Sequence, residues 1–351
     1  TQASHIKEVE PLLNQLLTMM DDKVRAREKV QRRLLQRKGM HWIVLRLLAC
    51  LPADFTETTG PLCYRALARL CDGAPNIQAE LAQHVHVFYA HFDSIPHEVA
   101  FVLSAIYKDN VNLCYTVEEY MMKKIAALIK DDLAAPYLML AKIIITPKDQ
   151  IVRRNQNLII KHLDSLDVQL LLFQGGAKAL RKTLLSDSSA ETPASSLAPV
   201  SRGKSAKATK MLQVHIGSIE LLTACMAEYN HDNKKRCRGG NPNLTLTLAD
   251  VEADLYDREL PVSVKRALLD FLVQAYILVD MSNINLLMQP EITNVFDQLA
   301  RWIELLPVDT RGSKVTRLTK SERSLLTDTY MAAAKAFFST LPASDLRQRE
   351  S

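Results

Sequence analysis

The feature that most constrains the fold of this chain is a helical apolar periodicity that recurs along most of its length. Apolar residues at positions i, i+3, i+4 and i+7 lie on one face of an α-helix. The clearest examples run through residues 40–51, 264–278 and 292–306. A short apolar run at residues 168–173 has the composition of a strand, but we expect a connector or a helix turn there. The sequence therefore predicts an all-α protein of roughly twelve helices.

Glycine content supports this fold class. The 351 residues include only 10 glycines, which is about 3%, whereas about 7% is usual. Hairpin turns and phosphate-binding loops depend on backbone conformations that glycine supplies. The scarcity of glycine therefore argues against an all-β fold and against a dinucleotide-binding sheet.

A chain of antiparallel helix pairs folds either as a globular bundle or as an α-solenoid, in which each pair packs only against its neighbours. The run of similar helices with short linkers favours the solenoid. The sequence has no strict repeat of the length found in regular repeat families. We therefore predict an α-solenoid of stacked antiparallel helix pairs with degenerate packing of the armadillo or HEAT type.

Helix starts are marked by short polar motifs. Thr116 with Glu119, and Thr319 with Glu322, have the T-x-x-E spacing of a capping box, in which each side chain satisfies a backbone N–H at the helix start. Pro147 is predicted at the first position of a helix, where its missing N–H costs nothing.

Residues 186–210 differ from the rest of the chain. They are rich in Ser, Ala, Pro and Lys and have no apolar period. Such a segment cannot bury enough apolar surface to offset the entropy of ordering it. We predict a flexible loop there, which divides an N-terminal part of the solenoid (residues 1–185) from a C-terminal part (residues 211–351).

Histidine side chains are potential metal ligands. The chain has nine, of which His84, His86, His91 and His97 form a local group. Two residues apart on a helix, His84 and His86 would face about 200° away from each other, whereas zinc ligands on one helix take i, i+4 spacing. We therefore predict no metal site and expect these histidines to be solvated or half-buried.

The six cysteines show no tight pairing and are predicted to be reduced thiols in a cytosolic environment. Cys63 and Cys71 share a helix face with leucines, so we predict small core residues rather than a redox pair. The sequence also lacks the motifs of hydrolases, zinc proteases and nucleotide-binding loops. We name no catalytic residue and no cofactor, and we predict that the chain is not an enzyme.

The strongest charge feature is Lys23–Lys38, with eight basic residues and one acidic residue, in a chain whose net charge is only +5. One interpretation is a solvated helix face whose apolar edge (Val24, Val30, Leu34 and Leu35) packs inward. The other is a contact with an acidic protein or a phosphoinositide. The absence of an aromatic stacking residue in this stretch argues against nucleic acid.

Charged residues interrupt every apolar stretch of this sequence, so we expect no membrane span. The first residues are polar and mixed in charge, unlike a secretory signal. The sequence begins with Thr1, and we expect a fragment or a processed product.

Several segments resemble one protein family in the same order along the chain. Residues 71–81 (CDGAPNIQAEL) look like a short signature between two helices, with Asn usual in the family where this chain has Ile77. Further similar segments are Gln31–Leu35, Val168–Leu184, His215–Ala227 and Lys335–Thr340. In these segments the chain resembles the cytosolic, RIH-type helical region that inositol trisphosphate receptors share with ryanodine receptors.

The resemblance implies a regulatory segment of a tetrameric calcium-release channel, on the cytosolic face of the endoplasmic reticulum. Its implied role is to transmit ligand-driven motion toward the pore through contacts with other domains and subunits. The family's inositol trisphosphate-binding core and pore helices lie outside this region. The alternatives are a free-standing helical scaffold that mediates protein interactions and a ryanodine-receptor-like fragment. The coding sequence on either side of this segment would separate these possibilities.

Overall fold

The computed structural model describes residues 2–20, 25–172, 201–228, 230–257, 260–278, 285–304 and 325–340. Within these ranges the regular secondary structure is helical, without a strand. Neighbouring helices pack against one another, as in an α-solenoid, and the predicted all-α fold class is confirmed. The contacts divide the chain into two compact units, residues 1–159 and 160–351, which are described separately.

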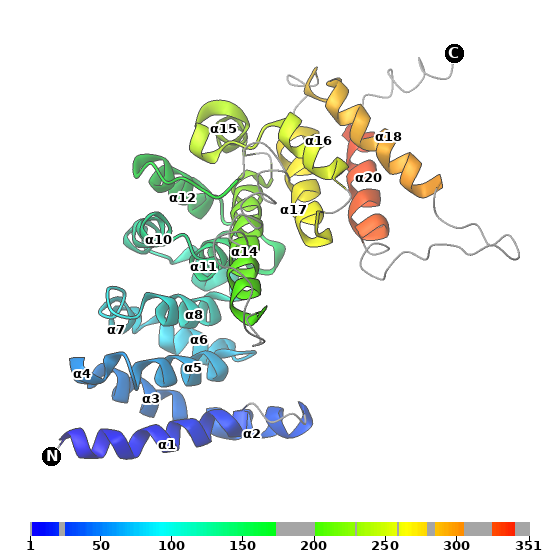
Figure 1. The fold of residues 1–351 in the computed structure, drawn as a ribbon. Helices are drawn as coiled ribbons and strands as arrows, with labels where there is room; N and C mark the ends of the chain where they lie inside the picture. Colours follow the sequence, from blue (N-terminus) through cyan, green and yellow to red (C-terminus); the bar gives the residue numbers. More distant parts are fainter. Residues whose placement is uncertain are drawn as a thin grey trace, which may run out of the picture. The chain divides into compact units, whose positions relative to one another are not determined.

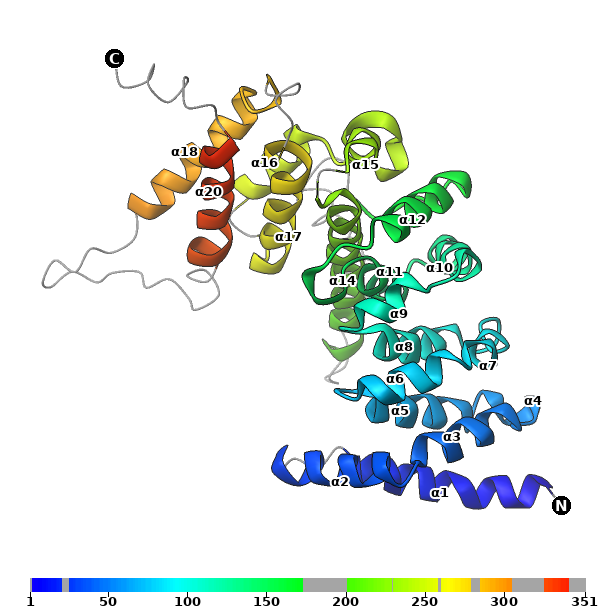
Figure 2. The same cartoon turned by 180° about the vertical axis from the view of Figure 1, so that it is seen from behind.

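The first unit is a stack of helices that follow one another along the chain (Figures 1 and 2). α5 packs on α1, α3 and α8, and α8 in turn packs on α6 and α11. The elements are α1 (Gln2–Met20), α2 (Arg25–Arg37), α3 (Met40–Ala49), α4 (Ala53–Thr56), α5 (Gly60–Cys71), α6 (Pro75–Ala82), α7 (Val85–Tyr89), α8 (Pro96–Tyr107), α9 (Val111–Tyr115), α10 (Glu119–Asp131), α11 (Ala135–Ile145), the 3₁₀ turn η1 (Pro147–Asp149) and α12 (Arg153–Ser165), which crosses the boundary between the units.

Proline begins several helices of this unit. Its fixed φ suits the first helical turn, and the N–H that it lacks would have no intrahelical acceptor there. The helices with proline at the first or second position are α5, α6, α8 and α11. Pro147 likewise takes the first position of η1, as predicted, although the longer helix α12 begins only at Arg153.

α8 forms the centre of the first unit. Val99, Ala100, Val102, Leu103 and Ile106 are all fully buried, because α5, α6 and α11 surround this helix. Burial of a Val, Leu or Ile side chain contributes about 1.5–3 kcal/mol. The exposed part of α8 is therefore narrow, and it includes Phe101.

The second unit begins at residue 160 and contains the rest of the described helices. α14 packs on α17, α16 packs on both α17 and α18, and α20 packs on the turn that follows α17. The elements are α14 (Ser201–Met226), α15 (His231–Lys235), η2 (Arg236–Gly240), η3 (Pro242–Leu244), α16 (Leu248–Tyr256), α17 (Val262–Leu272), η4 (Val273–Ile277), α18 (Pro290–Glu304), η6 (Leu325–Tyr330) and α20 (Met331–Thr340).

The capping box predicted at Thr116 and Glu119 does not form. α10 begins at Glu119, preceded by Glu118 without a capping side-chain hydrogen bond. The Thr116 hydroxyl instead donates to the Leu113 carbonyl at 2.9 Å, so it serves the end of α9 rather than the start of α10. Thr319 and Glu322 lie outside the described residues.

The segment predicted as a flexible loop is partly helical. α14 begins at Ser201, so residues 201–210 are helical; they follow the last proline of the segment and include Ala and Lys, which favour helices. Residues 186–200 lie outside the described residues. The contacts divide the chain at residues 159 and 160, inside α12, rather than in this segment. Residues 168–172 form no strand, as expected.

The face of α3 that is buried differs from the apolar stripe predicted over residues 40–51, which includes Ile43. Ile43 is 60% exposed, whereas His41 and Leu45 are buried. The inward position of His41 has a polar cause, because its Nε2 lies 2.7 Å from Oε2 of Glu80 on α6. Val44, Leu45 and Leu48 are buried on the same face, so apolar packing and this interhelical hydrogen bond together set which face of α3 points inward.

Candidate functional site

The buried thiols are unsuited to nucleophilic or redox chemistry. Cys63 and Cys71 are fully buried in α5, as the sequence predicts. Burial raises the pKa of both thiols to about 12, because the charged thiolate loses its hydration there. Both groups stay neutral at physiological pH and pack as small apolar residues.

The histidine group does not assemble a metal site. The rings of His84 and His86 lie with their centroids 5.9 Å apart, closer than a shared helix would place them, because α7 begins between them at Val85. His91 Nδ1 instead lies 2.8 Å from the Tyr64 hydroxyl, and burial lowers the pKa of His91. His97 stacks on Tyr137. No metal-binding group of His, Cys, Asp or Glu occurs within the described part of the chain.

The signature segment at residues 71–81 forms a sharp corner between α5 and α6. Gly73 has φ of +68°, a left-handed conformation that strains residues with a Cβ. The Gln78 amide donates to the carbonyls of Ala105 and Lys108 at 2.9 and 3.0 Å, and its oxygen accepts from Asn110 at 3.0 Å. Gln78 thus ties the corner to the end of α8. The neighbouring Ile77 is buried among apolar residues, and Gln78 makes the polar contacts of the corner.

A basic face on α2 is the first candidate for binding. Arg32 pairs with Asp72 at 2.7 Å and Gln36 donates to the Leu70 carbonyl at 2.7 Å, and these bonds hold one side of α2 against the corner. The opposite side is exposed. We call it the α2 basic face; it consists of Lys29, Val30, Arg33, Leu34, Arg37 and Lys38.

The α2 basic face differs from the interpretation of a solvated helix with a packed apolar edge. Val30 is 67% exposed and Leu34 is 55% exposed. With about 100° per residue, the two apolar side chains lie in the middle of the exposed arc, with cations on both sides. Two exposed apolar residues between cations make this face a candidate contact surface.

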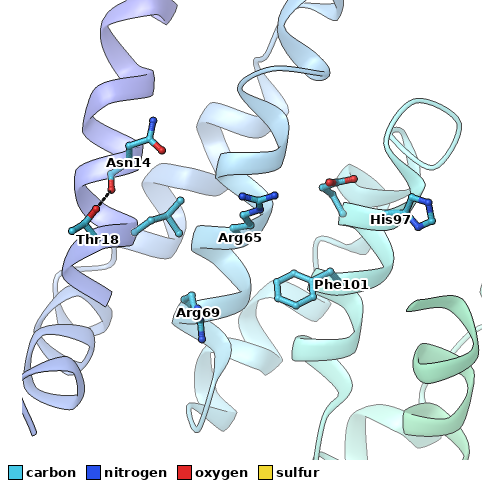
Figure 3. A pocket seen from close by; sticks show the side chains of 8 residues that line it. Asn14, Thr18, Arg65, Arg69, His97 and Phe101 are labelled. Carbon is cyan, nitrogen blue, oxygen red and sulfur yellow. Dashed lines mark hydrogen bonds between the residues drawn. The ribbon is translucent and has the colours of Figure 1, made fainter. Parts of the chain in front are cut away.

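A groove across the first unit is the second candidate. One cavity of about 720 Å³ lies among α1, α5 and α8 and is lined by residues that include Asn14, Thr18, Arg65, His97 and Phe101 (Figure 3). A second cavity of about 400 Å³ reaches toward α11 and η1. Arg69 and Phe101 line both cavities, so the two are neighbours on this surface; together we call them the α5/α8 groove.

Sequence reasoning missed the α5/α8 groove. Arg65 and Arg69 are one helical turn apart, a spacing visible in the sequence, but charged residues at that spacing occur on many solvated helices. Phe101 has an apolar neighbour on either side, Ala100 and Val102, and only the structure separates the exposed ring from those buried residues. The groove can therefore be recognised only in the folded structure, where residues from several helices come together.

No protein-family model matches the sequence. Within the described residues, no helix combines the length and the apolar character that crossing a bilayer requires.

Proposed function

We propose that this chain is a cytosolic coupling segment of an inositol trisphosphate receptor-like calcium-release channel. In this proposal the channel is a tetramer in the endoplasmic reticulum, and the segment passes ligand-driven motion toward the pore through its contacts with other domains and subunits. The observation that carries the proposal is the corner at residues 71–81, where the family-like signature makes a specific structural joint through Gln78.

Mechanical coupling requires elements that move together. Packed helices shift as rigid bodies and pass small displacements on through their interfaces. In the first unit the joints between helices are reinforced by buried amides: Gln78 joins α6 to the end of α8, and Asn155 of α12 donates to the carbonyls of Cys114 and Ile144 at 2.7 and 3.1 Å. Such bonds favour one arrangement of the helices over others.

We assign the α2 basic face to an anionic membrane surface that contains phosphoinositide. Lys29, Arg33 and Arg37 lie on one side of Val30 and Leu34, and Lys38 lies on the other. On a membrane, cations in this arrangement reach the phosphate headgroups while the central apolar side chains enter the interface. An acidic protein that binds the same face is the competing outcome.

Vesicle sedimentation tests this assignment. The chain is expected to bind vesicles that contain phosphatidylinositol phosphate, and the double variant Arg33→Glu/Arg37→Glu is expected to lose that binding. The double variant Arg46→Glu/Arg65→Glu, with two charge reversals at exposed positions outside this face, is the matched control. Equal binding to neutral vesicles, or undiminished binding of Arg33→Glu/Arg37→Glu, would refute the assignment.

A free-standing helical scaffold is the alternative function, favoured by the two exposed candidate surfaces. The discriminating experiment is to sequence and express the complete reading frame that contains this chain. We expect it to continue into pore helices with a Gly-rich filter, and the product to assemble as a tetramer in the endoplasmic reticulum. A reading frame without pore helices would exclude the channel and support the scaffold. A reading frame with pore helices and the length of a ryanodine receptor would support the ryanodine-receptor-like alternative.

A further inference from the structure

Thr116 and Thr247 share the spacing Thr-x-x-acid, but their hydroxyl groups make different contacts. At Thr247 the motif caps α16, because the hydroxyl donates to Oδ2 of Asp250 at 2.6 Å and accepts from the Asp250 backbone N–H at 3.2 Å. The Thr116 hydroxyl donates to the Leu113 carbonyl at 2.9 Å, and α10 begins at Glu119 without a capping side-chain hydrogen bond. Thr116 therefore has the same spacing without serving as a helix cap.

Thr116 lies on the surface, in the turn between α9 and α10. α9 ends at Tyr115 and α10 begins at Glu119, and Thr116 is exposed between them. Exposed connections between helices are more accessible to a modifying enzyme than the helices are. Opening the chain at Thr116 breaks one hydrogen bond of a short helix, whereas opening it at Thr247 also removes the cap of α16. Thr116 is thus the more accessible of the two hydroxyl groups.

Carboxylates follow Thr116 at the second and third positions. Glu118 and Glu119 are both exposed. Protein kinases select their substrates in part by charge complementarity, and acids after the hydroxyl residue suit a kinase with a basic substrate cleft. Glu119 already has a partner within the chain, but contacts of exposed carboxylates are weak. The cations of a kinase can therefore replace that partner while the enzyme is bound.

We propose that Thr116 is a phosphorylation site for an acid-directed protein kinase and that Arg154 of α12 binds the phosphate. In the reaction, Oγ1 of Thr116 forms a bond to the γ-phosphorus of ATP, and the bond from that phosphorus to the β–γ bridging oxygen breaks. ADP leaves, and the hydroxyl proton passes through the kinase to solvent. The product carries a charge of about −1.5 to −2 and three acceptor oxygens. The proposal concerns the first unit alone and does not depend on the channel function.

Arg154 lies beside the modified residue. Its Nη1 donates to the Val117 carbonyl at 2.7 Å, one residue after Thr116, and its side chain is exposed. That bond uses one of the five N–H donors of the guanidinium group, and bonds from such donors to a phosphate are strong because both groups are charged. Repulsion from the two glutamates opposes the phosphate, so its position depends on Arg154.

Phosphorylation also changes the contacts of the corner between α9 and α10. The modified Thr116 has no hydroxyl proton and can no longer donate to the Leu113 carbonyl. A bond within α9 is then exchanged for a charge-assisted bond from Arg154, which belongs to the first turn of α12. The modification therefore ties this corner to α12.

The first test incubates the full chain with magnesium ATP and a Ser/Thr kinase that selects acids after the hydroxyl residue. Mass spectrometry of the digested chain then gives the rate at each site. Relative to short peptides of the same two sequences, Thr116 should gain phosphate at least about fivefold faster than Thr247, because loss of a helix cap changes a folding equilibrium by about that factor. The double variant Glu118→Gln/Glu119→Gln should slow modification of Thr116 several-fold.

Each other outcome contradicts the phosphorylation site. If the peptide is modified and Thr116 of the folded chain is not, the corner protects the hydroxyl. If neither is modified, the two carboxylates do not direct the kinase. If the Glu118→Gln/Glu119→Gln variant is modified as fast as the unaltered chain, the site is not acid-directed.

Titration of the phosphate by phosphorus NMR tests the role of Arg154. A nearby guanidinium group favours the dianion, so Arg154→Gln should raise the midpoint of the second ionisation, which is ordinarily at about pH 6. Arg154→Lys keeps the charge and should stay closer to the unaltered chain. Arg65→Gln makes the same substitution on α5 and should leave the midpoint unchanged, and circular dichroism checks that each variant is folded. An unchanged midpoint in Arg154→Gln, or an equal rise in Arg65→Gln, would refute the contact with Arg154.

Discussion

The α5–α6 corner and the α5/α8 groove lie on overlapping helices but use polar groups in opposite ways. At the corner the Gln78 side chain is buried, and both ends of its amide are bonded to neighbouring elements. In the groove, the Arg65 side chain and the Phe101 ring are exposed. The difference teaches that the fully bonded Gln78 amide and an apolar core hold these helices together, whereas charge and aromatic surface stay outside for contacts.

The largest effect is expected on the free energy of unfolding, when substitutions at two positions of α8 are compared. Leu103 is fully buried and Phe101 is half exposed, two residues away. Leu103→Ala removes buried methyl groups and leaves a cavity, which should lower the free energy of unfolding by about 2–5 kcal/mol. Phe101→Ala should lower it by only about 1 kcal/mol, because half of the side chain is already in water. Urea unfolding followed by circular dichroism measures both, and similar losses would erase the distinction between interior and groove.

The second comparison uses two glutamines of α6, Gln78 inside the helix and Gln83 directly after its last residue. Gln78→Ala leaves the Ala105 and Lys108 carbonyls without their amide donor and should cost about 1–3 kcal/mol. Gln83 is exposed at the end of α6, so Gln83→Ala should cost less than about 0.5 kcal/mol. The same unfolding measurement applies. A loss of under about 0.5 kcal/mol for Gln78→Ala would show that the corner is held by apolar packing alone.

The third comparison sets the buried thiols against the exposed Cys50. Because burial raises the pKa of Cys63, Cys71 and Cys114 to about 12 in the folded state, the folded chain binds more protons than the unfolded chain above the ordinary thiol pKa. Stability should therefore be complete below about pH 9 and fall as the pH rises from there toward 12, by about 1 kcal/mol per thiol and pH unit.

Alkylation of the native chain measures the same difference directly. Cys50 should react with iodoacetamide at neutral pH, whereas Cys63, Cys71 and Cys114 should react only after unfolding. Rapid native modification of Cys71 would mean that the corner opens readily, which is incompatible with a joint held closed by Gln78.

The sequence was sufficient for the fold class because helical periodicity is a local signal that repeats along the chain. It also predicted the buried state of Cys63 and Cys71, which share a face with leucines. It could not predict which face of α3 is buried, since the bond between His41 and Glu80 joins residues that are far apart in sequence. The same limit explains why the exposure of Val30 and Leu34 was not predicted. Their spacing matches an apolar edge that packs inward, but whether they are exposed depends on which other helices cover α2.

The extent of the helices was harder to predict than their existence. Thr116 fits a capping box by its spacing, yet a competing acceptor at the end of α9 takes its hydroxyl. Residues 201–210 have the composition of a loop, yet they continue a helix that the packing of α14 on α17 supports. In both cases the outcome is decided by contacts that composition does not record.

The most direct test of the proposed coupling is calcium release by the complete protein in vesicles, with and without Gln78→Ala. The variant should be compared under conditions in which circular dichroism shows it folded and binding of inositol trisphosphate elsewhere in the protein is retained. We predict that Gln78→Ala reduces ligand-evoked release while ligand binding persists, because the corner no longer transmits the motion. Release equal to that of the unaltered protein would contradict a coupling role for this corner.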